Sequence, residues 1–104
     1  MHMPEIDQMS EAMFYILVVL NQAMHGYAII NAVKDLSHSR IELSTGTLYG
    51  IITRMEIDGL IELTESSGRR KSYLITEAGK RALKHEYCRL FSMMSDVNQI
   101  LLNA

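Results

Sequence analysis

A chain of 104 residues, 48% hydrophobic and 21% charged, suits one folded domain and does not have the composition of a disordered tail. No apolar run approaches the roughly 20 residues that a membrane-spanning helix needs, and the acidic N-terminal end is unlike a secretory leader, so we expect a cytoplasmic protein with no membrane partner. The single cysteine, Cys88, excludes an internal disulfide and suits a reducing compartment.

The net charge of −2 does not by itself favour a nucleic-acid partner, but the charges are unevenly distributed. Residues 1–68 hold three basic and nine acidic side chains, whereas residues 69–104 hold seven basic and three acidic ones. The sign changes at Arg69-Arg70-Lys71. Such a cationic stretch attracts a polyanion whatever the total charge, although a solvated helix face has the same pattern.

Helical spacing of apolar residues predicts two helices in the first third of the chain. Residues 1–8 have no periodicity and are expected to form a flexible N-terminus. A helix is predicted over about residues 9–23, with Ser10 as its N-cap. His25-Gly26 interrupts the pattern, and a second helix is predicted to reach about Leu36.

A third helix is predicted to begin at Ser44 or Thr45, which are both good N-caps, and to end before Gly59. Residues 41–43 alternate between apolar and polar, which suggests a short strand just before it. The inner stripe of the helix is Leu48, Ile51, Ile52 and Met55. Its outer face lacks carboxylates and consists of Thr45, Gly46, Thr47, Tyr49, Gly50, Thr53 and Arg54.

Two β-prone runs, residues 60–65 and 72–76, predict a hairpin whose loop, residues 66–71, carries a glycine and three cations. Thr76 is the expected N-cap of a last helix that runs to about residue 102. This helix has apolar residues at heptad spacing: Leu83, Tyr87, Leu90, Met94, Val97 and Leu101. Apart from the first helix, so short a chain offers this seam little to pack on, so we expect it to dimerise. An intramolecular core helix is the alternative.

Three short helices followed by a hairpin is the layout of a winged helix-turn-helix. The predicted fold is therefore mainly α with a small β-hairpin, with a DNA-binding domain over residues 9–76 and a C-terminal dimerisation helix over residues 77–104. The third helix is then the recognition helix, because a face without carboxylates approaches phosphates and base edges of double-stranded DNA without repulsion. The hairpin would be a wing that contacts the DNA backbone. An ordinary polar helix face and a solubilising turn are the alternatives.

Three sequence blocks resemble the PadR-like transcriptional regulators. They are His25-Gly26-Tyr27-Ala28-Ile29, then Thr45-Gly46-Thr47-Leu48-Tyr49 with Arg54-Met55-Glu56 and Gly59-Leu60-Ile61, and finally Gly68-Arg69-Arg70-Lys71 with Tyr73, Ile75-Thr76 and Gly79. Gly50 departs from the family, in which many members have proline at this position. The single C-terminal helix resembles the short branch of the family.

The resemblance implies a homodimeric repressor that binds a palindromic promoter site and responds to a small, often aromatic effector. The residues expected to bind DNA are Thr45, Thr47, Tyr49, Thr53, Arg54, Arg69, Arg70 and Lys71. By the same resemblance, His25 and Tyr27 are structural and hold the second helix against the first.

Two chains paired through their first and last helices would set the recognition helices about 34 Å apart, one turn of B-DNA. Methionine and aromatic side chains gather on these two helices and suit an adaptable pocket. The effector pocket is predicted to involve Met13, Phe14, Leu17, Phe91 and Met94. Simple filling of the core by these side chains is the alternative.

Other functions have weaker support from the sequence. His85 and Cys88 share a helix face, but no third group is evident to complete a catalytic constellation, so we expect no enzyme. A metal-responsive regulator would need His85 and Cys88 with His2 or His38, and the usual ligand spacings are missing, so no metal or other cofactor is expected. A winged helix that binds protein instead of DNA is a further alternative.

Overall fold

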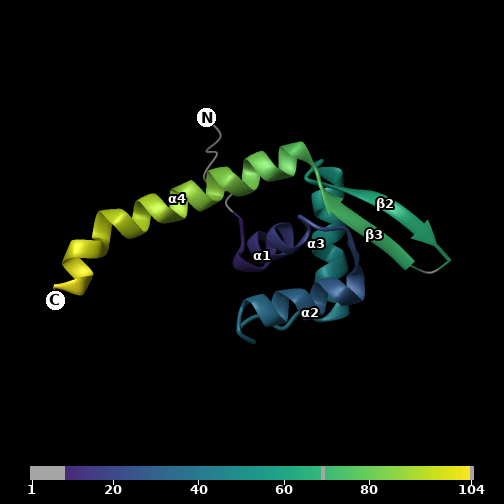
Figure 1. Ribbon diagram of the computed structural model, residues 1–104, viewed down its shortest axis with the longest axis horizontal. Helices are drawn as coiled ribbons and strands as arrows, with labels where there is room; N and C mark the ends of the chain where they lie inside the picture. Colours follow the sequence, from purple (N-terminus) through teal and green to yellow (C-terminus); the bar gives the residue numbers. More distant parts are fainter. Residues whose placement is uncertain (1–8, 69, 104) are drawn as a thin grey trace.

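The computed structural model describes residues 9–68 and 70–103 of the chain. The expected flexible N-terminus, residues 1–8, and the expected DNA-binding residue Arg69 lie outside the described residues. The elements, in chain order, are α1 (Glu11–Val19), β1 (Met24–His25), α2 (Gly26–Leu36), α3 (Thr45–Ile57), β2 (Ile61–Ser67), β3 (Arg70–Ile75) and α4 (Glu77–Leu102). Figure 1 shows the first three helices gathered at the base of the hairpin, with α4 extending away from them.

Within the described residues, three of the four helices begin at the N-caps predicted from the sequence. The hydroxyl oxygens of Ser10, Ser44 and Thr76 each accept a hydrogen bond from the backbone N–H three residues later, at 3.1, 3.1 and 3.0 Å. Such a cap contributes about 1 kcal/mol to helix stability. The starts of α1, α3 and α4 are therefore determined locally.

Helix α1 is shorter than predicted, because the chain after Val19 leaves the helix and forms hydrogen bonds with strand β3 instead. The backbone carbonyl of Leu20 accepts a hydrogen bond of 2.9 Å from the N–H of Ile75 in β3. Met24 and His25 then pair with Tyr73 and Ser72 as an edge strand. The resulting antiparallel sheet has the strand order β1-β3-β2.

The strand predicted at residues 41–43 is wrong. Ile41 and Leu43 are half-buried against the core and Glu42 is exposed, but the segment is not in a strand. The hydroxyl of Ser37 accepts a hydrogen bond of 3.0 Å from the backbone N–H of Ile41, so a side chain satisfies that donor. The alternating pattern reflects one-sided burial of a connection that has no neighbouring strand.

The core lies where α1, α2 and α3 meet the inner face of the hairpin. Its members are Ile16, Leu17, Leu20, Ile29, Val33, Leu48, Ile52, Met55, Ile61, Tyr73 and Ile75. The predicted inner stripe of α3 is confirmed at Leu48, Ile52 and Met55, whereas Ile51 is only partly buried. Burial of this stripe turns the opposite side of α3 toward solvent.

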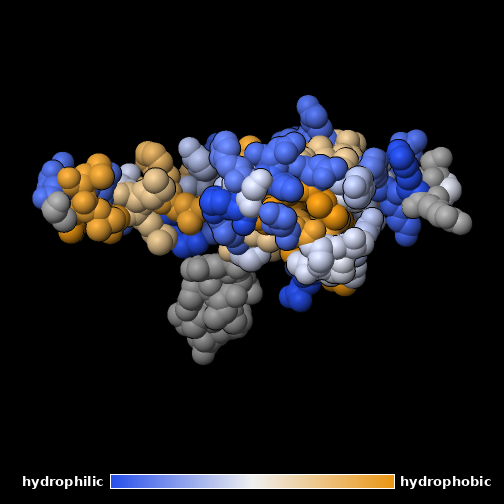
Figure 2. All heavy atoms as spheres, turned by 90° about the horizontal axis from the view of Figure 1, so that it is seen from below, coloured by the Kyte–Doolittle hydropathy of each residue, from blue (hydrophilic) through white to orange (hydrophobic). Residues whose placement is uncertain are grey.

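Helix α4 leaves the domain after its first turns, and all of its residues from Phe91 onward are exposed. Figure 2 shows hydrophobic side chains gathered at its far end. Of the helices in the described part of the chain, none combines the length and apolar character that a bilayer crossing requires. The fold is a winged helix-turn-helix followed by a long C-terminal helix, as predicted, and the structure adds that the outer part of this helix protrudes from the domain (Figure 1).

Candidate nucleic-acid interface

The outer face of α3 is exposed at every position named from the sequence, from Thr45 to Arg54. Helix α3 also runs without interruption through Gly50. A Cβ atom added at Gly46 or at Gly50 would meet no other atom within 4 Å. The packing of the chain itself therefore does not need glycine at either position.

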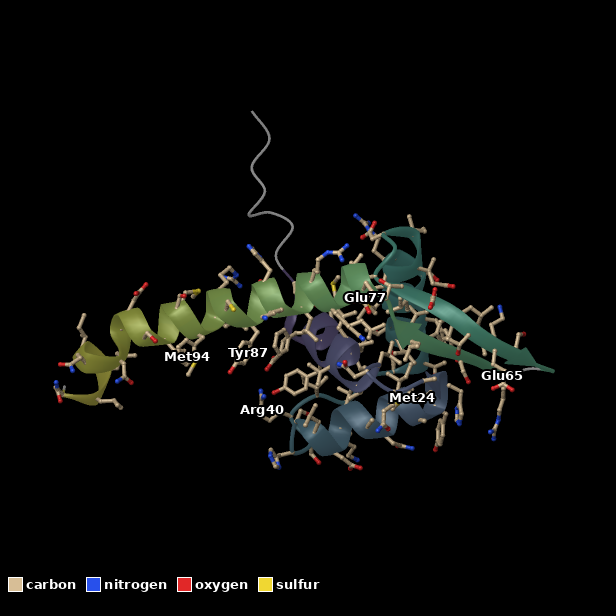
Figure 3. The ribbon with its side chains drawn as sticks, turned by 45° about the horizontal axis from the view of Figure 1, so that its top comes forward. Met24, Arg40, Glu65, Glu77, Tyr87 and Met94 are labelled. Atoms are coloured by element: carbon tan, nitrogen blue, oxygen red, sulfur yellow. The ribbon has the colours of Figure 1, made fainter. Side chains whose placement is uncertain are left out.

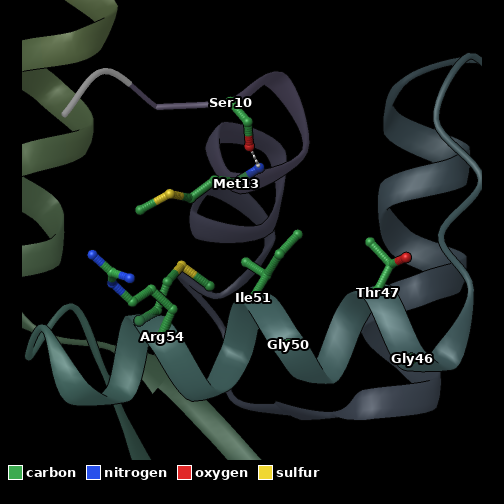
Figure 4. Close-up of a pocket in the computed structure, with 8 residues that line it drawn as sticks. Ser10, Met13, Gly46, Thr47, Gly50, Ile51 and Arg54 are labelled. Carbon is green, nitrogen blue, oxygen red and sulfur yellow. Dashed lines mark hydrogen bonds between the residues drawn. The ribbon is translucent and has the colours of Figure 1, made fainter. Parts of the chain in front are cut away.

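Thr47 and Arg54 lie on the flank of α3 that faces the start of α1. Figure 4 shows both on the side of α3 that faces α1, with Ile51 between them, and Ser10 and Met13 line the same cleft. Thr47 Oγ1 accepts a hydrogen bond of 3.0 Å from the Ser44 hydroxyl. Arg54 Nε lies 3.2 Å from Asp58 Oδ2, but an exposed pair of this kind is weak, so little opposes a move of Arg54 to another anion.

Tyr49 lies on the other flank of α3 and crosses over Gly26 at the start of α2. An added Cβ at Gly26 would lie 2.8 Å from Tyr49 Cζ and closer still to its hydroxyl oxygen. The missing side chain at Gly26 thus makes room for the tyrosine ring. Tyr49 and Gly26 line a second cleft together with Arg70 and Lys71, so the structure brings Tyr49 close to the cationic part of the hairpin.

The hairpin is longer and its turn tighter than predicted, because the two strands stay paired as far as Ser67 and Arg70. Gly68 has a φ of +60°, a left-handed conformation that glycine adopts without strain. Arg70 and Lys71 are therefore the first residues of β3 and are both exposed. Among the residues that the structure describes, neither is part of an ion pair.

An arginine that the sequence reasoning missed ties the connection before α3 to α1. Arg40 donates hydrogen bonds to Glu11 Oε2 at 2.7 Å and to the Tyr15 hydroxyl at 2.9 Å. The bond to Glu11 raises the pKa of Arg40 above its ordinary value. His38 and Ser39 have left-handed φ values of 55° and 65°, which are unfavourable for residues with side chains. Arg40 follows this turn directly and helps to hold it.

The predicted seam of α4 is half-buried at Leu83 and Leu90 and exposed at its other positions. Figure 3 shows Tyr87 and Met94 on the same side of the helix, where they are 58% and 68% exposed. Elsewhere on α4, Glu86 is buried and accepts two hydrogen bonds from Arg89, which lower the pKa of its carboxyl group. Along the outer half of the helix, the apolar seam has no packing partner among the residues that the structure describes.

The five residues predicted to form an effector pocket do not share one cleft in the described part of a single chain. Leu17 is fully buried in the core, and Met13 lines the cleft beside α3. Phe14 lines a different cleft, between α1 and α4. Phe91 and Met94 are exposed farther along α4. The pocket stays a prediction that depends on a second chain.

Within the described ranges, no group of three or more histidine, cysteine or acidic side chains is placed to hold a metal ion. His2, one of the candidate ligands named from the sequence, lies outside these ranges.

The fold and the arrangement of its outer helix and hairpin define a winged helix-turn-helix regulator. The chain belongs to the transcriptional regulator PadR-like family, whose model matches residues 16–85. This family consists of regulators and not enzymes. A PadR family transcription regulator of Clostridium difficile R20291 has a similar crystal structure, with a TM-score of 0.73 and 28% identity over 88% of this chain and 99% of that one.

Two curated proteins are also similar in sequence. The transcriptional regulator YqjI of Escherichia coli is 30% identical over 60 residues, which cover 58% of this chain and 29% of that protein. A 37.1 kDa protein of transposon TN4556 from Streptomyces fradiae is 34% identical over 74 residues, covering 71% of this chain and 21% of that protein. The chain thus spans less than a third of the length of these relatives.

Proposed function

We propose that this protein is a sequence-specific DNA-binding regulator that acts as a homodimeric repressor on a palindromic promoter site in the cytoplasm. The observation that carries the proposal is the exposed outer face of α3, which has no carboxylate from Thr45 to Met55, beside two cations of β3 that form no ion pair with any other described residue. Such a face approaches phosphates and base edges without electrostatic repulsion. The proposed DNA contacts are those named from the sequence, with Arg70 and Lys71 on the backbone.

The exposed apolar seam of α4 supports a dimer. Met94, Val97 and Leu101 leave a contiguous apolar surface on one helix, and such surfaces mark interaction sites. A second copy of α4 offers a seam of identical spacing, so a twofold dimer would bury both. The two wings would then lie on one duplex.

Salt dependence of DNA binding tests this function. Binding of a labelled duplex from upstream of the protein's own gene is measured by fluorescence anisotropy at several salt concentrations, with a random duplex for comparison. For Arg70→Ala we expect the slope of log affinity against log salt to become shallower by about two units per dimer, because one phosphate contact is lost in each chain. Lys34→Ala, at the far end of α2, is the matched control. An unchanged slope in the Arg70 variant would remove this residue from the interface.

Replacing Gly50 with alanine is expected to make the folded protein more stable but its binding to DNA weaker. Alanine should stabilise α3 by about 0.5–1 kcal/mol, because glycine is a poor helix former and an added Cβ meets no atom there. DNA affinity should fall, because the new methyl group holds the duplex away from the helix backbone. Thermal unfolding and anisotropy measure the two effects.

Asn31→Ala, on the exposed side of α2, is the control for this prediction, because it also improves helix propensity but leaves α3 unchanged. It should raise the melting temperature without weakening DNA binding. If Gly50→Ala binds DNA as tightly as the wild type, the backbone of α3 does not approach the duplex closely at this position.

The effector proposed from the sequence is a small apolar or aromatic compound. In support, Phe14, Val18, Leu83 and Tyr87 line an apolar cleft between α1 and α4. This cleft adjoins the seam through which the chains would pair, so a ligand there would alter the spacing of the two wings. A thermal-shift screen with planar aromatic compounds tests the idea, and a screen without any stabilising compound would contradict it.

A further inference from the structure

One small cleft joins three elements that are far apart in the sequence. His25, Gly26 and Tyr27 contribute from the junction of β1 and α2, Tyr49 from α3, and Arg70 and Lys71 from β3. Its volume is about 280 Å³, below the range typical of pockets for drug-sized molecules. A cleft of this size favours a small polar group as its occupant.

The backbone pairing explains how these residues meet. His25 is the register partner of Ser72, so the start of α2 lies beside the residue that follows Lys71. Lys71 shares a sheet face with Tyr73, because side chains alternate along a strand. Tyr73 is buried, so Lys71 is on the side of β3 that faces the helices.

The chemistry of the lining is that of an anion site. The residues that line the cleft include Lys71, on the helix-facing side of β3, Arg70 beside it in the strand, and Tyr27, Tyr49 and His25. No carboxylate lines the cleft, and within residues 9–68 and 70–103 neither cation is part of an ion pair. Arginine and lysine with hydroxyl donors are the groups that contact DNA phosphates in known complexes. The positive end of the α2 dipole adds to the attraction.

The exposure of Tyr27 indicates a role outside the fold. Its side chain is 71% exposed, although the resemblance implied that His25 and Tyr27 only hold α2 in place. A tyrosine kept for packing would be largely buried. Tyr27 instead lies at the mouth of a cleft that also contains Tyr49, a residue of the proposed recognition helix.

We propose that this cleft binds a backbone phosphate of the DNA duplex, and that His25 and Tyr27 are DNA-contacting residues. The inference rests on the proposed function and extends it from α3 and the wing to the start of α2. One phosphate held between the three elements would fix the wing relative to the recognition helix. Because the contact is to the backbone, it positions the protein and does not select a base sequence.

The test uses the 104-residue chain with Tyr27→Phe, which removes only a hydroxyl, and His25→Leu, which removes the imidazole and its hydrogen-bond donors. Each variant is expected to bind DNA about 100-fold more weakly or worse, since the dimer loses two hydrogen bonds to charged groups. The loss should be equal for the upstream duplex and for a random duplex. The salt slope should be unchanged in Tyr27→Phe and shallower by about two units in Lys71→Ala. Asn31→Ala on the same helix is the control, and melting temperatures verify folding.

Inorganic phosphate provides a second measurement, by amide chemical shifts of Gly26 and Tyr27. Weaker DNA binding by both variants supports the proposal, whether or not free phosphate also shifts these amides. A response to phosphate together with unchanged DNA binding would identify a free anion as the ligand and overturn it. If both variants bind DNA as tightly as the wild type, and the affinity of the wild type still falls steeply with salt, this inference is overturned and the proposed function stands. A wild-type protein that binds no duplex would overturn both.

Discussion

Gly79→Ala is expected to destabilise the fold by about 3 kcal/mol, at the upper end of the range for overpacking. The added Cβ would overlap the backbone carbonyl oxygen of Leu60 and lie 2.7 Å from Ile75 Cγ1. The carbonyl cannot easily retreat, because it accepts a hydrogen bond of 3.0 Å from the N–H of Thr76. Thr76 is in turn anchored through its hydroxyl, which donates to the carbonyl of Gly59 at 2.6 Å. Glycine is thus needed where the first turn of α4 packs on Leu60, just before β2, and on Ile75, at the end of β3.

Thermal unfolding followed by circular dichroism measures this effect. For a domain of this size, about 3 kcal/mol corresponds to a fall in melting temperature on the order of 10–20 °C. Gly46→Ala is the matched control, because it is the same chemical change in a helix, at a position where the new Cβ meets no atom within 4 Å. The control should be as stable as the wild type or more stable. If Gly79→Ala and Gly46→Ala are equally stable, the prediction is wrong, and α4 can move away from Leu60 to accommodate the added methyl group at little cost.

The double substitution Met94→Glu and Leu101→Glu is expected to abolish the dimer and to weaken DNA binding by about 100-fold or more. Both side chains are about two-thirds exposed in the single chain, at 68% and 67%, so the domain should stay folded. In a paired seam, each chain would place two charges in an apolar interface, where burial of an unpaired carboxylate is strongly unfavourable. The loss of affinity follows because the second half-site is no longer bound intramolecularly.

Sedimentation equilibrium and anisotropy measure the two consequences of this change. Ser92→Glu with Gln99→Glu is the control, since it adds the same charges at the same seven-residue spacing on the opposite side of α4. The control should remain dimeric. A dimeric seam variant, or a control that dissociates to the same extent, would contradict pairing through the heptad positions.

Features that depend on neighbours along the chain could be predicted from the sequence. Ser10, Ser44 and Thr76 were identified as N-caps because a cap needs only a hydroxyl and an N–H group three residues away. The buried stripe of α3, and therefore its exposed outer face, followed from helical periodicity. The length of α4 and the apolar seam along it followed from heptad spacing.

Features that depend on contacts between distant segments were decided only by the tertiary structure. The two-residue strand Met24–His25 is too short to show any periodicity, and it exists because β3 pairs with it. The alternation at residues 41–43 predicted a strand, but no strand forms there, because no neighbouring strand pairs with this segment. Arg40 reaches Glu11 and Tyr15 across 29 and 25 residues. The cleft beneath Tyr49 likewise needs α2, α3 and β3 folded together, since no local pattern places a cation beside a distant aromatic ring.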